Sequence, residues 1–115
     1  MAYNEHLAEK IRQALAHLPG VEEKKMFGGL AFMVNNKMCL TVGADRMMCR
    51  IDPNMHEEAL KRKGSRTVMM KGREYKGYIY VNEDSLEKKA DFNYWAKLAL
   101  DFNKKAKASV KRQRQ

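Results

Sequence analysis

The hydrophobic positions of the first twenty residues repeat with the period of an α-helix. Four apolar residues recur at helical spacing: Leu7, Ile11, Leu15 and Leu18. Such spacing places them on one face. Asn4 is a suitable N-cap, and Pro19-Gly20 ends the pattern. The sequence therefore predicts an amphipathic helix from about Asn4 to Leu18.

From Val21 to Ile51 the pattern changes to short apolar runs separated by turn residues. We expect three strands, over about residues 21–34, 38–42 and 46–51. Asn35-Asn36 predicts a hairpin turn, since Asn tolerates the left-handed conformation that such turns need. Gly28-Gly29 is interpreted as a bulge or bend within the first strand. A phosphate-binding loop is disfavoured there, because no helix follows the glycines.

A second helix is predicted between Asp52, as N-cap, and Gly64. Pro53 suits its first position, and acidic residues precede basic ones as the helix dipole favours. His56-Glu57-Glu58 matches the start of the zinc-binding HExxH pattern. However, Leu60 stands where the second His ligand is required, so no metal site is expected.

Two further strands are expected around 67–70 and 76–81, followed by a last helix from Asp91. Its apolar stripe has helical spacing throughout: Phe92, Trp95, Ala99, Phe102 and Ala106. Hairpin-length connections indicate a mainly antiparallel sheet. The predicted fold class is α+β, a two-layer α/β sandwich of order α-β(3)-α-β(2)-α, with helices covering one face of the sheet.

The fifth predicted strand lies in the stretch KGYIYVNE, which is similar to the RNA-stacking octamer of RRM domains. Ile79 and Glu83 do not fit that octamer, and an RRM does not begin with a helix. A core strand is the preferred interpretation, with Ile79 and Val81 on one face. Tyr78 and Tyr80 then lie on the other face, where we expect a homodimer interface, because monomers rarely expose large apolar patches.

The formal net charge is +9, and most of it lies in the last twelve residues. This tail holds six cations and no acid: Lys104, Lys105, Lys107, Lys111, Arg112 and Arg114. The remainder has 17 basic and 14 acidic residues, so it is only mildly basic. We expect residues 104–115 to be a disordered tail and residues 1–103 to be one domain. Weak, non-specific nucleic-acid binding through the tail is the alternative function.

Candidate chemistry is sparse. Cys39 and Cys49 are expected to be free thiols on neighbouring strands, with Leu40 opposite Cys49 and the two thiols on opposite faces. No catalytic, cofactor-binding or metal-binding residues are predicted. No apolar run is long enough to span a membrane, and the polar N-terminus lacks a signal peptide. We therefore expect a cytoplasmic protein that is not an enzyme.

Several stretches together resemble the N-terminal domain of the TfoX/Sxy family of bacterial competence regulators. They are VEEKKMFGGLAFMV (21–34), MMCRI (47–51), KGYIYV (76–81) and Trp95, and the element MFGG-x-x-F is the most specific. The resemblance covers about residues 1–103 and implies the fold order given above. Full-length regulators carry a second, C-terminal domain, where this sequence has its basic tail. The family has no established catalytic residues.

The resemblance implies a regulatory or protein-interaction module with a link to transcription or competence regulation. A protein partner is expected, and a cofactor is not.

Overall fold

The computed structural model describes residues 3–26 and 28–106. They form a six-stranded antiparallel sheet in the order β1-β2-β3-β4-β6-β5. The strands are β1 (Val21–Met26), β2 (Gly29–Val34), β3 (Lys37–Val42), β4 (Arg46–Arg50), β5 (Ser65–Met70) and β6 (Arg73–Asn82). The helices are α1 (Glu5–Leu15), α2 (His56–Ala59) and α3 (Lys89–Asn103), with 3-10 turns at Pro53–Met55 and Glu83–Leu86. The predicted two-layer α+β fold is confirmed.

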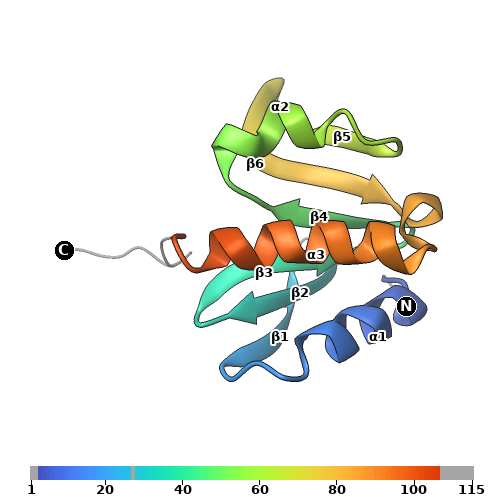
Figure 1. Ribbon diagram of the computed structural model, residues 1–115, viewed down its shortest axis with the longest axis vertical. Helices are drawn as coiled ribbons and strands as arrows, with labels where there is room; N and C mark the ends of the chain where they lie inside the picture. The colour runs from blue at the N-terminus through green and yellow to red at the C-terminus, as the bar shows by residue number, and fades with distance from the viewer. Residues whose placement is uncertain (1–2, 27, 107–115) are drawn as a thin grey trace.

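The helix layer covers one side of the sheet, which we call the covered face. Figure 1 looks onto this side and shows α3 crossing in front of the middle strands, with α1 near β1 and β2. One row of paired residues crosses the sheet on this face: Glu23, Phe32, Leu40, Cys49, Ile79 and Thr67. Its four central members are fully buried. Burial of this apolar area is the main source of stability in such a domain.

The first predicted strand is two strands. Gly28 has a φ of +73°, and the chain reverses there so that Met26 pairs with Gly29. Gly29 lies so close to the Val42 carbonyl that an added Cβ would overlap it. The two glycines therefore make a tight hairpin, and the expectation of a bent single strand was wrong. Charged β1 pairs with apolar β2 as an edge strand.

Helix α1 is fixed to the sheet at its edge as well as through its apolar face. Asn4 caps it as predicted, with its side-chain oxygen accepting the Leu7 N–H at 2.9 Å. The Arg12 guanidinium donates twice to the Glu23 carboxylate of β1, at 2.7 and 2.9 Å. These bonds lower the pKa of Glu23. The helix ends at Leu15, so the last predicted turn is absent.

The second predicted helix is much shorter than expected. Asp52 and Pro53 begin a 3-10 turn, and α2 follows for four residues. After it, Lys61 and Arg62 donate their N–H groups three residues back, not four. This tighter winding ends the helix, and Lys61 pairs with Glu58, three residues before it, at 3.3 Å.

The predicted stripe of α3 packs against the sheet. The helix begins two residues before Asp91, and Trp95 at its centre is 1% exposed. Asn103 joins its C-terminal end to the β2–β3 hairpin: its Nδ2 donates to the Val34 carbonyl at 3.2 Å. Lys37 of the same hairpin donates to the Asn103 carbonyl at 2.8 Å.

The two thiols share one core. Leu40 opposes Cys49 as predicted, but the β2–β3 register shifts at Phe32/Met33 and leaves Cys39 without a partner in β2. Such a bulge redirects a side chain. Both cysteines are free and belong to the covered-face core, so the expectation of opposite faces was wrong.

Candidate functional site

The opposite side of the sheet has no helix packed on it in the described residues, and we call it the open face. One row of paired residues crosses all six strands on this face: Lys24, Ala31, Thr41, Met48, Tyr80 and Arg66. Both ends of the row are cations, and its middle is small or apolar. Along β4 and β6 the same face carries Arg46, Arg50, Tyr78 and Asn82, because alternate residues of a strand share a face.

Tyr80 lies between two guanidinium groups. The Arg46 Cζ lies 3.8 Å from the centre of the Tyr80 ring, and the Arg66 Cζ lies at 5.6 Å. The Arg66 Nη1 also donates to the Asn82 Oδ1 at 2.7 Å, which fixes the plane of its guanidinium. Within residues 3–26 and 28–106, neither arginine has a carboxylate at ion-pair distance.

Tyr78 continues this arrangement toward the other end of β6. The Arg50 Cζ lies 6.0 Å from the Tyr78 ring and 5.6 Å from the Phe102 ring of α3. Its Nη1 is buried without a hydrogen-bond partner in the described residues. The charge of Arg50 is therefore held among aromatic rings and is not neutralised by a described carboxylate.

The alternation predicted for this strand is confirmed. Ile79 and Val81 are fully buried, and Tyr78 and Tyr80 are half-buried on the open face. A homodimer through the two tyrosines stays a prediction. It would bring the arginines of two copies together, and a species near twice the 13.4 kDa chain mass in sedimentation would support it.

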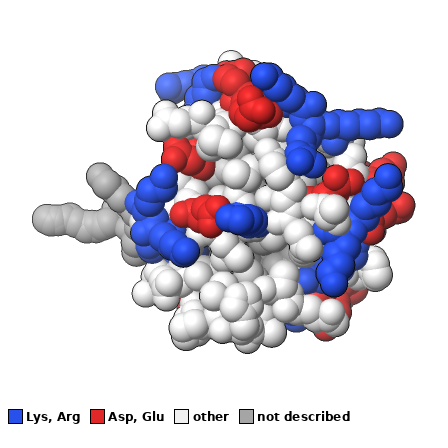
Figure 2. All heavy atoms as spheres, in the orientation of Figure 1, with Lys and Arg blue, Asp and Glu red and all other residues white. Residues whose placement is uncertain are grey.

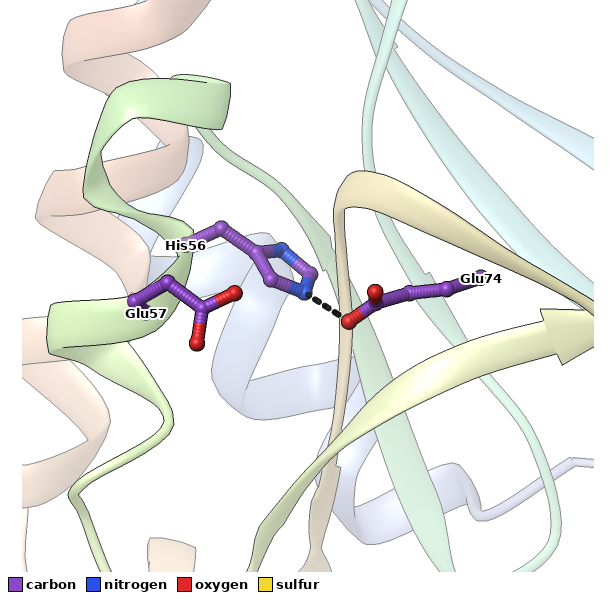
Figure 3. A group of neighbouring side chains, drawn as sticks. All are labelled: His56, Glu57 and Glu74. Carbon is purple, nitrogen blue, oxygen red and sulfur yellow. Dashed lines mark ion pairs between the residues drawn. The ribbon is translucent and has the colours of Figure 1, made fainter.

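A second cluster lies between α2 and β6 (Figure 3). His56 is fully buried, and its Nδ1 accepts the Gly77 N–H at 2.9 Å. Its Nε2 lies 2.9 Å from the Thr67 hydroxyl and 3.3 Å from the Glu74 carboxylate. Glu57, beside it, pairs with Lys76, which lowers the pKa of Glu57. Ligand atoms of His56, Glu57 and Glu74 lie within 4.8 Å of one another, which is the spacing of a metal site.

The hydrogen bonds of His56 disfavour a metal. Because Nδ1 accepts a backbone N–H, the proton of the neutral ring must lie on Nε2. Nε2 then donates to Thr67 or Glu74. A metal on Nε2 would displace that proton and leave a ring without one, whereas metal-bound His normally donates from its second nitrogen. His56 is thus best understood as a structural link between α2, β5 and β6.

The thiols are equally unsuited to chemistry. Burial raises the pKa of Cys39 to about 12 and that of Cys49 well above its usual value. The thiolate, which is the reactive form, is therefore scarce at neutral pH.

A groove runs along the helix layer between α1 and α3, and we call it the α1–α3 groove. One part of about 520 Å³ is lined by apolar residues of both helices, of the turn after α1 and of β2: Ala14, Leu18, Val34, Ala96 and Leu100. A second part of about 410 Å³ shares Ala14 and Asn93 with the first, so the two are continuous. Figure 2 shows a broad uncharged area below α3 on this side of the molecule.

The rim of the groove is more basic than acidic. Four lysines line it: Lys10, Lys89, Lys97 and Lys104. Two acids also line it, Glu87 and Asp101, and Asp101 pairs with Lys97 at 2.9 Å. The groove therefore combines an apolar floor with a positive edge.

The predicted tail site is only partly described. Lys104 is exposed at the end of α3, and Lys105 pairs with Asp52 at 3.0 Å. Lys107, Lys111, Arg112 and Arg114 lie outside the described residues. The tail alternative therefore stays a prediction. No helix in the described part of the chain is long and apolar enough to cross a membrane.

Sequence reasoning missed the arginines of the open face. Part of the signal was present, because Arg46 and Arg50 are spaced by an even number of residues along β4 and so lie on one face, but Met47, Met48 and Cys49 between them are all buried. However, only the strand order shows that they meet Tyr78 and Tyr80, since β6 is distant in sequence but adjacent to β4 in the sheet.

Comparison with known proteins gives one match. Residues 13–103 match a family model described as the TfoX N-terminal domain. No curated protein and no solved structure matches the chain significantly.

Proposed function

Because the chain belongs to the family of the TfoX N-terminal domain, we propose that it is a regulatory module that binds a protein partner and is not an enzyme. We connect it with transcription and competence regulation, which is the role of the regulators that the sequence resembles. The reactive groups of the described residues support a non-enzymatic role: both thiols are buried, and His56 is fully used in hydrogen bonds.

The observation that carries this proposal is the α1–α3 groove. Its apolar floor suits the apolar stripe of an amphipathic helix, which is a common way for one protein to hold another. Its surplus of lysines suits a helix with acidic residues beside that stripe. We therefore assign the groove to an acidic amphipathic helix of a partner protein.

The test is site-specific crosslinking in bacterial cells that express the full chain. A photo-crosslinking residue in place of Gln13, which is exposed and lines the groove, should capture a partner. Mass spectrometry of the product should place the crosslink in a helical segment with acidic flanks. The same residue in place of Glu22, on the open face, is the matched control and should not capture this partner.

A second variant makes the result specific to the groove. Leu100→Glu places a carboxylate in the groove and should abolish the crosslink from position 13, while urea unfolding checks that the domain still folds. Capture that is equal from positions 13 and 22, or that survives Leu100→Glu, would exclude the groove as the docking site.

A further inference from the structure

We propose that the open face of the sheet binds single-stranded nucleic acid. This inference is independent of the α1–α3 groove, because the two surfaces lie on opposite sides of the sheet. It is also distinct from the tail, because the residues that carry it belong to β1, β4, β5 and β6.

The first argument is charge. Four cations share the open face at paired strand positions: Lys24, Arg46, Arg50 and Arg66. Glu22, on the edge strand β1, is the one acid at those paired positions. None of the four cations has an ion-pair partner in the part of the chain that the structure describes. The Arg50 guanidinium is partly buried between the Tyr78 and Phe102 rings, so the charge available to phosphate groups is that of Lys24, Arg46 and Arg66.

The second argument is the arrangement of the guanidinium groups that carry the charge. The Arg46 guanidinium stacks on the Tyr80 ring at 3.8 Å, and Arg66 is oriented by its bond to Asn82. These flat groups are held in place before any ligand arrives. Bases of single-stranded nucleic acids stack on aromatic rings and on guanidinium planes. Phosphate binding alone would not require an aromatic ring between the two arginines.

The third argument is the shape of the surface. Between the cations the row is uncharged: Ala31 is fully buried, Met48 is 9% exposed and Thr41 is half-buried, so the accessible groups of the row are Tyr80 and the cations. Adjacent strands lie about 4.8 Å apart, so the row from Lys24 to Arg66 spans roughly 24 Å. A site of about four nucleotides fits this width, which is at the small end of known single-strand sites. A duplex would hide the base faces that this surface can stack.

The similarity of the stretch KGYIYV to the RNA-stacking octamer of RRM domains is relevant to this proposal. The strand order of this fold differs from that of an RRM, and Ile79 and Val81 belong to the core. However, RRM domains also present aromatic side chains from a strand on a sheet face without helices. The same physical arrangement arises in this fold by another strand order.

The experiment uses the full chain and a fluorescein-labelled dT12 oligonucleotide in an anisotropy titration. Arg46→Gln combined with Arg66→Gln removes two phosphate contacts, so the log–log salt slope should become less steep by about 1.4. Tyr80→Leu keeps an apolar side chain but removes the ring, and it should weaken binding about 5- to 100-fold. Circular dichroism and urea unfolding check the fold of each variant.

The chain offers a matched control on its covered side. The Arg62 Cζ lies 3.5 Å from the Tyr94 ring, which is the same kind of stack away from the open face. Arg62→Gln and Tyr94→Leu should leave dT12 binding unchanged. A further variant with all six tail cations changed to Gln measures the part of the binding that the tail contributes.

Four outcomes would overturn the proposal. The first is no binding of dT12 by the folded wild type. The second is binding that the tail variant abolishes and the open-face variants leave unchanged. The third is tighter binding of the matching duplex, which would show that stacking is not used. The fourth is equally tight, competitive binding of a poly-glutamate peptide, which would assign the face to an acidic protein.

Discussion

The two faces of one sheet differ sharply in what their residues do. On the covered face, the row from Phe32 to Ile79 is fully buried beneath α1 and α3. The neighbouring row, which is shifted by one residue along each strand, lies on the open face. It ends in Lys24 and Arg66 and contains the half-buried Tyr80. The first row supplies apolar burial, and the second presents oriented charge. The two-residue period of the strands thus gives the first row a fully buried apolar centre and gives the second row the half-buried Tyr80 and the exposed Arg66 beside the buried Ala31 and Met48.

The substitution with the largest expected effect on stability is Trp95→Ala, which tests the role of the covered face. Trp95 is 1% exposed and packs at the centre of the covered face. Its removal should lower the free energy of unfolding by about 3–5 kcal/mol, because it leaves a large cavity. Urea unfolding measures the effect. A variant as stable as the wild type would contradict the assignment of α3 as the main cover of the sheet.

A matched pair of substitutions compares the faces directly. Ile79 and Arg66 lie on the adjacent strands β6 and β5 but on opposite faces. Ile79→Ala should lower the free energy of unfolding by about 2–5 kcal/mol. Arg66→Ala should change it by no more than about 0.5 kcal/mol, as is usual for exposed residues. Equal losses in urea titrations would show that the open face also carries the stability of the fold.

Gly77→Ala tests the backbone that sets the alternation of β6. Gly77 has a φ of +91°, and an added Cβ would lie 2.9 Å from the Ile51 carbonyl oxygen. The variant should lose about 1–3 kcal/mol of unfolding free energy, because an L-residue is strained there. Gly72→Ala is the control for positive φ alone: its φ is +77°, and nothing lies within 4 Å of its added Cβ. If Gly77→Ala lost no more unfolding free energy than Gly72→Ala, the close contact with the Ile51 carbonyl would not contribute to the loss.

The smallest expected effect is pH-dependent and concerns the edge strand β1. Hydrogen bonds from Arg12 hold the pKa of Glu23 below its usual 4.5 in the folded state. The stabilisation is therefore present above pH 4.5 and is lost as the pH falls through the folded pKa. Glu23→Gln should cost about 1 kcal/mol or less at pH 7, and less at pH 3 than at pH 7.

The neighbouring residue serves as its control. Glu22 lies on the open face and has no ion pair in the described residues. Glu22→Gln should show a smaller change between the same two pH values, measured by urea unfolding. An equal change for both variants would mean that the Arg12–Glu23 pair does not fix α1 to the sheet.

The sequence predicted the parts of the fold that depend on local patterns. Asn35 and Asn36 adopt positive φ in the β2–β3 turn, and Asn4 caps α1. Alternation placed Ile79 in the core and Tyr80 outside it. In each case the local conformation depends on residues that are adjacent in the sequence, so the sequence pattern is enough to predict it.

The features that the sequence did not predict depend on contacts between distant segments. The Gly28–Gly29 hairpin forms because β1 pairs beside β2, and Cys39 turns into the core because the register shifts. His56 was assessed only as a metal ligand, but its partners Thr67 and Gly77 come from β5 and β6. The arginine–tyrosine stacks likewise require the strand order.

The two edges of the sheet have unequal protection against joining another sheet. Strand β1 carries four consecutive charged residues, VEEKKM, and charge on an edge strand opposes pairing with a second chain. Strand β5, SRTVMM, carries one charged residue, Arg66, and its Met69 is 53% exposed. Aggregation through strand addition should therefore begin at β5, and a lysine in place of Met69 should extend the time for which a concentrated solution stays clear.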